Sequence, residues 1–146
     1  MRFRHRCQLR WSDFDAFRHL NNVRVLELFQ EARIAFALER FPERGVFDSA
    51  TVVARQEVDY LRPLEQRSGD VDVSLWVTRL GRSSVHLATE VLDPTGAGPA
   101  GTDVAGPYAR GLCVVVAWDL TGRRPRAIDA TERDLFTSYL ESPVPD

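Results

Sequence analysis

The amino-acid sequence predicts an α+β fold in which a curved antiparallel sheet of about five strands wraps around one long helix. Two observations carry this prediction. One strand-like segment is followed by a single stretch of helical periodicity, and the regular segments after it alternate as strands do until a short final helix. Because helices and strands are segregated along the chain, the pattern favours α+β over a wound parallel sheet.

The first two predicted elements are a strand and the long helix. Residues Phe3 to Trp11 alternate loosely between apolar and polar side chains, which is typical of a strand. From Val23 to Arg40, apolar residues recur at helical spacing but spread around much of the helix, so we expect its surface to be largely enclosed. Asn21 or Asn22 is suited to cap this helix, because its side-chain oxygen can accept an N–H group of the first turn.

Four more strands and a short helix are predicted after it. The strand segments are rich in alternating Val, Leu and Thr, and Arg79 to Ser83 reads as a hairpin turn between two of them. Residues 94–107 hold four Gly and three Pro and are expected to form a loop. The strands are expected over residues 51–61, 71–77, 85–91 and 108–118, and the helix over Glu132 to Leu140 with Thr131 as its cap.

Composition excludes several classes of protein. The chain has 146 residues, with 19 basic residues that are all Arg against 21 acidic ones, and a formal net charge of −2. This length suits one domain, expected over residues 1–141 with a frayed tail at 142–146. The near-neutral charge disfavours nucleic-acid binding, and no segment reaches the roughly 18 apolar residues that span a bilayer. Without Lys, no side-chain amine is available for Schiff-base chemistry.

The cysteines and the N-terminal residues indicate in which cellular compartment the protein is expected. Cys7 and Cys113 are the only two cysteines and lie in apolar surroundings, which is typical of free buried thiols. Residues 1–10 are Arg-rich without the apolar segment of a signal peptide. We therefore expect a cytoplasmic protein.

The segment from Asp13 to Asn22 carries the chemically interesting residues. The first N–H groups of a helix lack internal partners and can polarise a carbonyl oxygen placed beside them. The carboxylate of Asp15 is close enough in sequence to attack such a carbonyl, or to activate a water that does. The pattern thus fits acyl hydrolysis, but Asp and Asn are also common as turn and cap residues.

A longer motif favours the catalytic interpretation of these residues over the interpretation as turn and cap residues. The stretch WSDFDAFRHLNN at residues 11–22, followed by Phe29-Gln30-Glu31-Ala32-Arg33, closely resembles the opening motif of hotdog-fold acyl-CoA thioesterases of the 4-hydroxybenzoyl-CoA thioesterase branch. Looser similarity continues through the stretches 58–64, 69–70 and 81–84 to the strand that ends near Trp118. The hotdog fold, in which a sheet wraps a long helix, agrees with the order of predicted elements.

The resemblance implies a role for each residue that matches the motif. Asp15 matches the catalytic carboxylate, as nucleophile or general base, and the backbone N–H of Asn22 matches the donor to the thioester carbonyl. His19 and Asn21 match positions that line or shape the site, and Asp13 matches a structural Asp. Two hairpin residues fall where relatives contact the nucleotide end of coenzyme A, although a solvated turn explains them equally well; they are Arg82 and Ser83.

Arg18 departs from the pattern, because the family usually has Gly there. Glycine adopts a positive φ freely and lets a ligand approach closely. Either the backbone at Arg18 is ordinary, or this side chain reshapes the path of the acyl or pantetheine group.

The function implied is an acyl-CoA thioesterase that releases a carboxylic acid and free CoA. The resemblance implies no metal and no dissociable cofactor, since coenzyme A is part of the substrate. It implies a homodimer or homotetramer with the acyl pocket at a subunit boundary. Two alternatives remain open: a thioesterase acting on acyl carrier protein, and a non-catalytic module that binds acyl-CoA.

Overall fold

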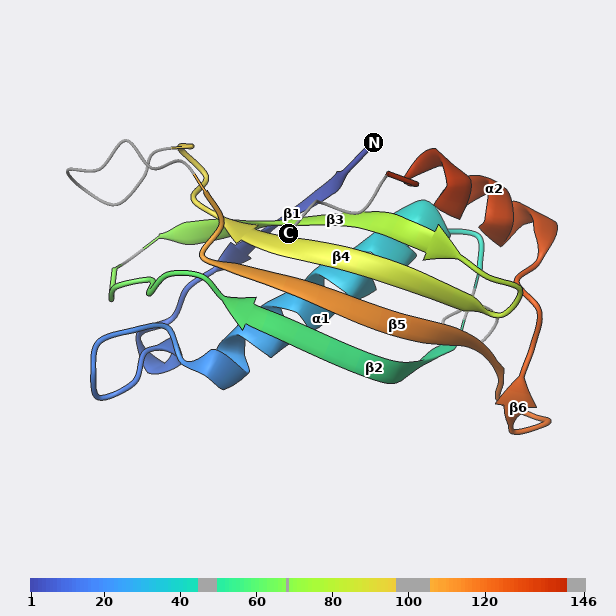
Figure 1. Ribbon diagram of the computed structural model, residues 1–146, viewed down its shortest axis with the longest axis horizontal. Coiled ribbons are helices and arrows are strands. Elements are labelled where there is room, and N and C mark those ends of the chain that lie inside the picture. Colours follow the sequence, from blue (N-terminus) through green and yellow to red (C-terminus); the bar gives the residue numbers. More distant parts are fainter. Residues whose placement is uncertain (45–49, 68, 97–105, 142–146) are drawn as a thin grey trace.

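The computed structural model describes residues 1–44, 50–67, 69–96 and 106–141, and its strands form one antiparallel sheet with a long helix across one face (Figure 1). Five strands follow in the order β1-β3-β4-β5-β2, so that β1 and β2 form the two edges. The predicted α+β fold is confirmed. The strands are β1 (Phe3–Gln8), β2 (Thr51–Tyr60), β3 (Asp70–Leu80), β4 (Ser84–Leu92) and β5 (Ala109–Asp119).

Two small elements were not predicted. The two-residue strand β6 (Arg124–Pro125) pairs with the end of β5, outside the main strand order. Strand β1 ends at Gln8 rather than at Trp11, because Trp11–Asp13 form a single 3-10 turn, η1. The predicted tail at 142–146 and most of the predicted loop at 94–107 lie outside the described residues.

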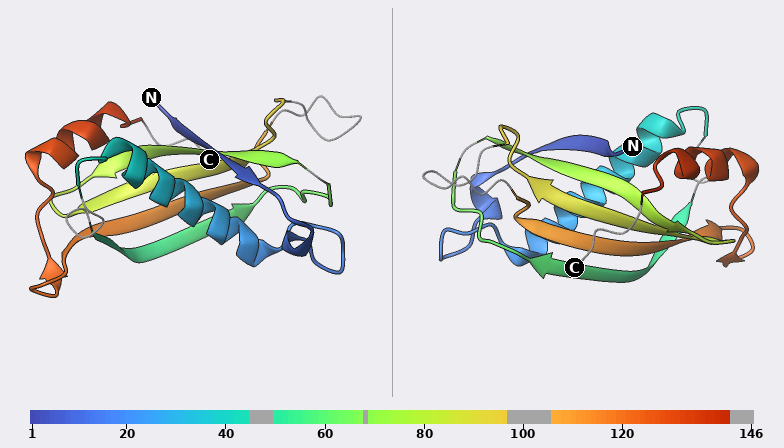
Figure 2. Two further views of the ribbon diagram at one scale, coloured as in Figure 1. Left: turned by 180° about the vertical axis from the view of Figure 1, so that it is seen from behind. Right: turned by 45° about the horizontal axis from the view of Figure 1, so that its top comes forward.

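The long helix α1 spans Asn22–Arg40, and Asn21 is its N-cap. Its buried face, which includes Leu28 and Phe29, packs against the concave face of the sheet, as the view from behind shows (Figure 2). Gly111 of β5 permits this close approach, because a Cβ there would lie 2.5 Å from the ring of Phe29.

The expectation that α1 would be largely enclosed is wrong. Three of its apolar side chains are more than half exposed: Val23 at 58%, Ile34 at 51% and Leu38 at 57%. Strand β2 is also exposed along nearly its whole length. The apolar pattern of α1 therefore serves two faces, of which the sheet of the same chain covers one.

The final helix α2 spans Ala130–Ser138, and its predicted cap was wrong. Asp129, not Thr131, is the N-cap: its carboxylate accepts the N–H of Glu132, and the Glu132 carboxylate accepts the N–H of Asp129. This reciprocal capping box satisfies two otherwise free donors and starts the helix two residues early.

Helix α2 closes one end of the core with aromatic contacts. Phe136 stacks on Phe36 of α1 with ring centroids 6.2 Å apart, and Tyr139 meets the same ring edge-on at 5.0 Å. Cys7 and Cys113 are both buried and free, as predicted. In the part of the chain that the structure describes, no helix is long and apolar enough to span a membrane.

Candidate active site

The loop between η1 and α1 holds Asp15 in a tight turn. One carboxylate oxygen of Asp15, Oδ1, accepts the backbone N–H groups of Phe17 at 2.9 Å and His19 at 3.2 Å. The backbone of Asp15 also donates to the carbonyl of His19 and accepts from the N–H of Arg18. The carboxylate is therefore oriented by main-chain donors to Oδ1, and among the described residues no hydrogen bond to its other oxygen, Oδ2, is found.

Arg18 keeps the backbone conformation that glycine would supply. Its φ is +62°, in the left-handed region that disfavours residues with a Cβ. The departure from the family motif thus changes the side chain but not the turn, and the interpretation with an ordinary backbone at Arg18 is wrong.

The turn is tied to the segment that follows β2. The N–H of Gln66 donates to the carbonyl of Arg18 at 2.7 Å, and the N–H of Leu20 donates to the carbonyl of Leu64 at 2.8 Å. These bonds fix the Asp15 turn against residues 64–66, which lead from β2 toward β3. The site is therefore supported from two parts of the chain.

Asp13 holds the base of the loop, in agreement with its predicted structural role. It is 3% exposed and accepts from the backbone and side chain of Arg10, with the Arg24 guanidinium 3.2 Å away. Burial alone would raise the pKa of Asp13, but the hydrogen bonds from Arg10 and the charge of Arg24 outweigh it and lower the pKa. The carbonyl of Asp13 accepts the N–H of Asn21, which joins the loop to the helix cap.

The start of α1 presents a donor to the same region. The Asn21 side chain accepts the N–H of Val23 at 2.9 Å, so Asn21 shapes the helix start through its cap. The N–H of Asn22 occupies the first helical position, where N–H groups have no intrahelical acceptor. The hydroxyl of Tyr60 donates to the carbonyl of Asn22 at 3.0 Å and joins this helix start to the end of β2.

A cavity of about 410 Å³ brings the predicted catalytic residues together. Asp15, His19 and Asn22 line it, with apolar walls from α1 and the sheet, and Asn21 does not. Its lining also includes polar residues that the sequence did not indicate; these are Tyr60, Arg62 and Tyr108.

Arg62 is the most unusual of the residues missed. Its guanidinium lies 3.9 Å above the ring of Tyr108, and Nη2 donates to the carbonyl of Gly106. Its Nε and Nη1 are shielded from water and have no hydrogen-bond partner among the described residues. The motif Leu61-Arg62-Pro63 was visible in the sequence, but only the sheet order places it beside the Asp15 turn.

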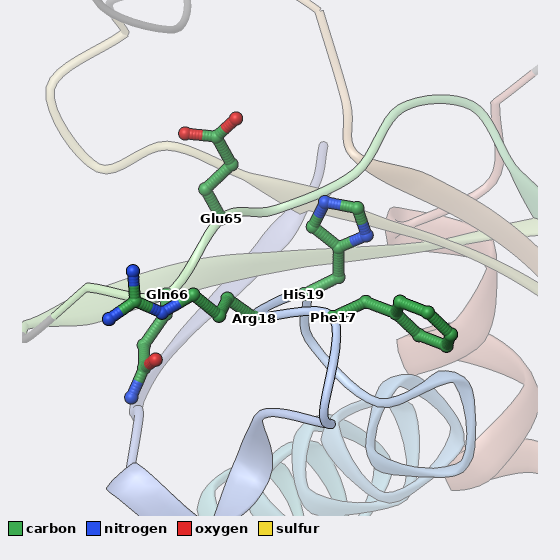
Figure 3. A pocket seen from close by; sticks show the side chains of 5 residues that line it. All are labelled: Phe17, Arg18, His19, Glu65 and Gln66. Atoms are coloured by element: carbon green, nitrogen blue, oxygen red, sulfur yellow. The ribbon is translucent and has the colours of Figure 1, made fainter.

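Arg18 faces a neighbouring cavity of about 460 Å³. This cavity is lined by Phe17, Arg18, His19, Glu65 and Gln66, and Arg18 extends beside Gln66 while Phe17 points away (Figure 3). His19 lines both cavities, whereas Arg18 does not line the one that holds Asp15.

Arg82 and Ser83 are not brought to this site within one chain. They lie in the hairpin before β4, and their carbonyls accept the N–H groups of Ile128 and Ala117. Val91, at the other end of β4, lines the Asp15 cavity. Eight residues of strand separate Ser83 from Val91, which is about 26 Å at the usual rise of about 3.3 Å per residue.

Comparison with known proteins decides the family. The family model of the thioesterase-like superfamily matches residues 9–135. The chain belongs to the thioesterase-like superfamily. A thioesterase from Thermus thermophilus, solved in complex with coenzyme A and Zn, is 31% identical and has a TM-score of 0.74, with 96% of this chain and 95% of that one covered.

Two further comparisons extend this result. A predicted thioesterase from Bacillus stearothermophilus is 24% identical with a TM-score of 0.82, covering 99% of this chain and all of the other, and supports the hotdog fold. The uncharacterized protein YsmA of Bacillus subtilis is 37% identical over 85 residues, which cover 58% of this chain and 57% of YsmA. The resemblance that the motif predicted is confirmed at the level of family and fold.

Proposed function

We propose that this thioesterase-superfamily chain hydrolyses acyl-CoA thioesters to a carboxylic acid and free CoA, with Asp15 as the catalytic carboxylate. One observation carries the proposal. Asp15 is oriented by two backbone N–H groups and lines the same cavity as Asn22, the first residue of α1. A base and an oxyanion donor on one cavity are what acyl transfer to water requires.

The chemical step uses only groups of this site and the substrate. In one route, Asp15 takes a proton from a water whose oxygen attacks the thioester carbon, and the backbone N–H of Asn22 stabilises the oxyanion. Collapse of the tetrahedral intermediate breaks the C–S bond, and the proton passes to the departing CoA thiolate. In the alternative route, the Asp15 carboxylate attacks the thioester carbon, the C–S bond breaks and CoA leaves as the thiolate. Water then cleaves the mixed anhydride to the carboxylic acid, which regenerates the Asp15 carboxylate and supplies the proton for the thiolate. His19 lines the wall beside both groups and orients the substrate.

We assign Arg62 as a further donor to the substrate. Its guanidinium lines the cavity without a carboxylate partner among the described residues, and two of its nitrogens lack any acceptor. A carbonyl oxygen of the bound thioester or pantetheine group would supply one if, on binding, the side chain turns so that a shielded nitrogen faces the cavity. Replacing Arg62 by Met should raise KM by about 10- to 100-fold, the range for a lost charged hydrogen bond of about 1.5–3 kcal/mol. Arg62→Lys should recover part of the loss.

The exposed apolar residues favour a second copy of the chain as partner. A groove of about 400 Å³ lies between α1 and β2, and its lining includes Ile34, Leu38 and Val53, all about half exposed. A homodimer or homotetramer would cover this groove and complete the acyl pocket. It would also allow Arg82 and Ser83 of one copy to approach the nucleotide end of CoA bound at the Asp15 cavity of another.

The experiment is a rate comparison on matched thioesters. The purified protein should hydrolyse at least one member of a panel of acyl-CoAs, and faster than the same acyl group on acyl carrier protein. If the carrier-protein thioester is hydrolysed faster, the substrate is acyl carrier protein and not acyl-CoA. Tight acyl-CoA binding without release of thiol would contradict hydrolysis and favour a binding module.

The oligomer is tested separately. Light scattering coupled to size exclusion should give a dimer or tetramer, and Leu38→Glu should dissociate it, because a charge would be buried at the apolar groove. A wild-type monomer at assay concentration would contradict this part of the proposal. The free buried thiols Cys7 and Cys113 support our placing the reaction in the reducing cytoplasm.

A further inference from the structure

Three metal-ligating side chains meet where the edge strand β1 faces α1. His5 and Cys7 are two residues apart on β1, so their side chains leave the same face of the strand. Glu31 comes from the facing helix, 24 residues further along the chain. One imidazole nitrogen, the thiol sulfur and one carboxylate oxygen of these residues all lie within 4.8 Å of one another.

The donor set matches the preference of zinc-class ions. Thiolate, imidazole and carboxylate are the three protein ligands of Zn²⁺, at about 2.3, 2.0–2.1 and 2.0–2.2 Å. In a tetrahedron with those bond lengths, ligand atoms stand about 3.3–3.7 Å apart. The observed spread exceeds this by about an ångström, which rotation of the half-buried His5 ring and of the Glu31 side chain can close.

The surroundings leave the ligands available. Arg24 donates to Oε1 of Glu31 at 2.7 Å, which leaves Oε2 for another partner. A divalent ion would bind Cys7 as the thiolate and would displace the proton of the thiol. Cys7 is only 2% exposed, but the Glu31 side chain is 42% exposed and gives solvent a route to the cluster.

We propose that His5, Cys7 and Glu31 form a site for a zinc-class divalent ion, with water as the fourth ligand, that clamps the edge strand β1 to α1. The site is separate from the Asp15 cavity, whose lining includes none of these residues. It is connected to the catalytic loop, however, because Arg24 bridges Glu31 and Asp13. Metal binding would therefore stiffen the contact that holds the base of that loop.

The test uses Co²⁺ as a spectroscopic probe on the full chain without an affinity tag, since a His tag would bind the ion itself. Wild-type protein should bind one Co²⁺ per chain, with the sulfur-to-cobalt charge-transfer absorption of a thiolate ligand, and Zn²⁺ should displace it. Cys7→Ser should abolish that absorption. The matched control is Cys113→Ser, which removes the other buried free thiol and should leave the spectrum unchanged.

The remaining ligands are tested with the thiol intact. His5→Asn and Glu31→Gln should each weaken Zn²⁺ binding, measured by competition with a chromophoric chelator, by at least about tenfold, the least that loss of a supporting partner costs. Thermal unfolding shows whether each variant is folded. If Cys7→Ser does not fold, the zinc affinities of His5→Asn and Glu31→Gln test the proposed site. The proposal is overturned if wild type shows no thiolate absorption, if Cys113→Ser removes it, or if neither ligand variant weakens binding. None of these readings depends on thioester hydrolysis.

Discussion

Arg18 offers a direct test of how the turn that holds Asp15 is built. Its φ of +62° costs a residue with a Cβ about 1–2 kcal/mol relative to an ordinary conformation. Glycine removes that cost but loses about 0.5–1 kcal/mol more conformational freedom on folding. Arg18→Gly should therefore stabilise the protein by a net amount of about 0.5–1 kcal/mol, or about 2–4 °C in Tm for a chain of this size.

A second substitution separates the backbone from the side chain. Arg18→Ala removes the guanidinium but keeps the Cβ, so its stability should stay within about 0.5 kcal/mol of wild type. Urea unfolding of wild type and both variants, followed by circular dichroism, gives the three free energies. Equal stability of Arg18→Gly and Arg18→Ala would refute the reasoning, because the gain would then come from the side chain and not from the backbone.

Two further predictions concern the packing and the charge of the fold. Gly111→Ala should destabilise the protein by about 1–3 kcal/mol in urea unfolding, because the new Cβ meets the ring of Phe29; Gly106→Ala, where the space is open, is the control and should stay near wild type. Asp13→Asn should cost about 1.5–3 kcal/mol at pH 7, since it removes the buried carboxylate that accepts from Arg10 and faces Arg24, while Arg24 keeps Glu31 as a partner. The folded pKa of Asp13 is lowered, so its contribution is complete above the unfolded value of about 3.9 and is lost as the pH falls through the folded value. The stability difference between wild type and Asp13→Asn should therefore shrink below pH 4, and a difference independent of pH would contradict the ion-pair assignment.

Local chemistry explains why the sequence indicated the geometry of the Asp15 loop. Asn21 caps α1 through its own side chain, and Asp15 folds back on N–H groups within four residues. Such short-range contacts are encoded by neighbouring residues, so their pattern predicts them. The cap of α2 could have been predicted in the same way, because Asp129 followed three residues later by Glu132 is a capping-box pattern.

The rest of the site depends on the order of strands. Tyr60 ends β2, Arg62 follows it by two residues, and Tyr108 precedes β5; they share a cavity with Asp15 because β2 and β5 are neighbours in the sheet. Periodicity predicts strands but not which strands are adjacent. The cluster of His5, Cys7 and Glu31 was missed for the same reason, since it joins a strand to a helix distant in sequence.

The surface of α1 shows another limit. Ile34 and Leu38 gave the helix an apolar pattern on most sides, and burial by the chain's own sheet was the simplest interpretation. Helical periodicity cannot distinguish a face covered by the same chain from one covered by a second copy. In the structure, the chain's own sheet leaves this face exposed beside β2.

The central claim is that Asp15 performs the hydrolysis, and the most direct measurement compares Asp15→Asn with wild type on the best acyl-CoA of the panel. The amide keeps the size of the side chain but is no longer a base or a nucleophile, so kcat should fall by at least about 100-fold, within the usual contribution of a general base. The matched control is Asp134→Asn on the exposed surface of α2, which should retain full activity. An Asp15→Asn variant that is folded and hydrolyses the substrate at the wild-type rate would contradict the account.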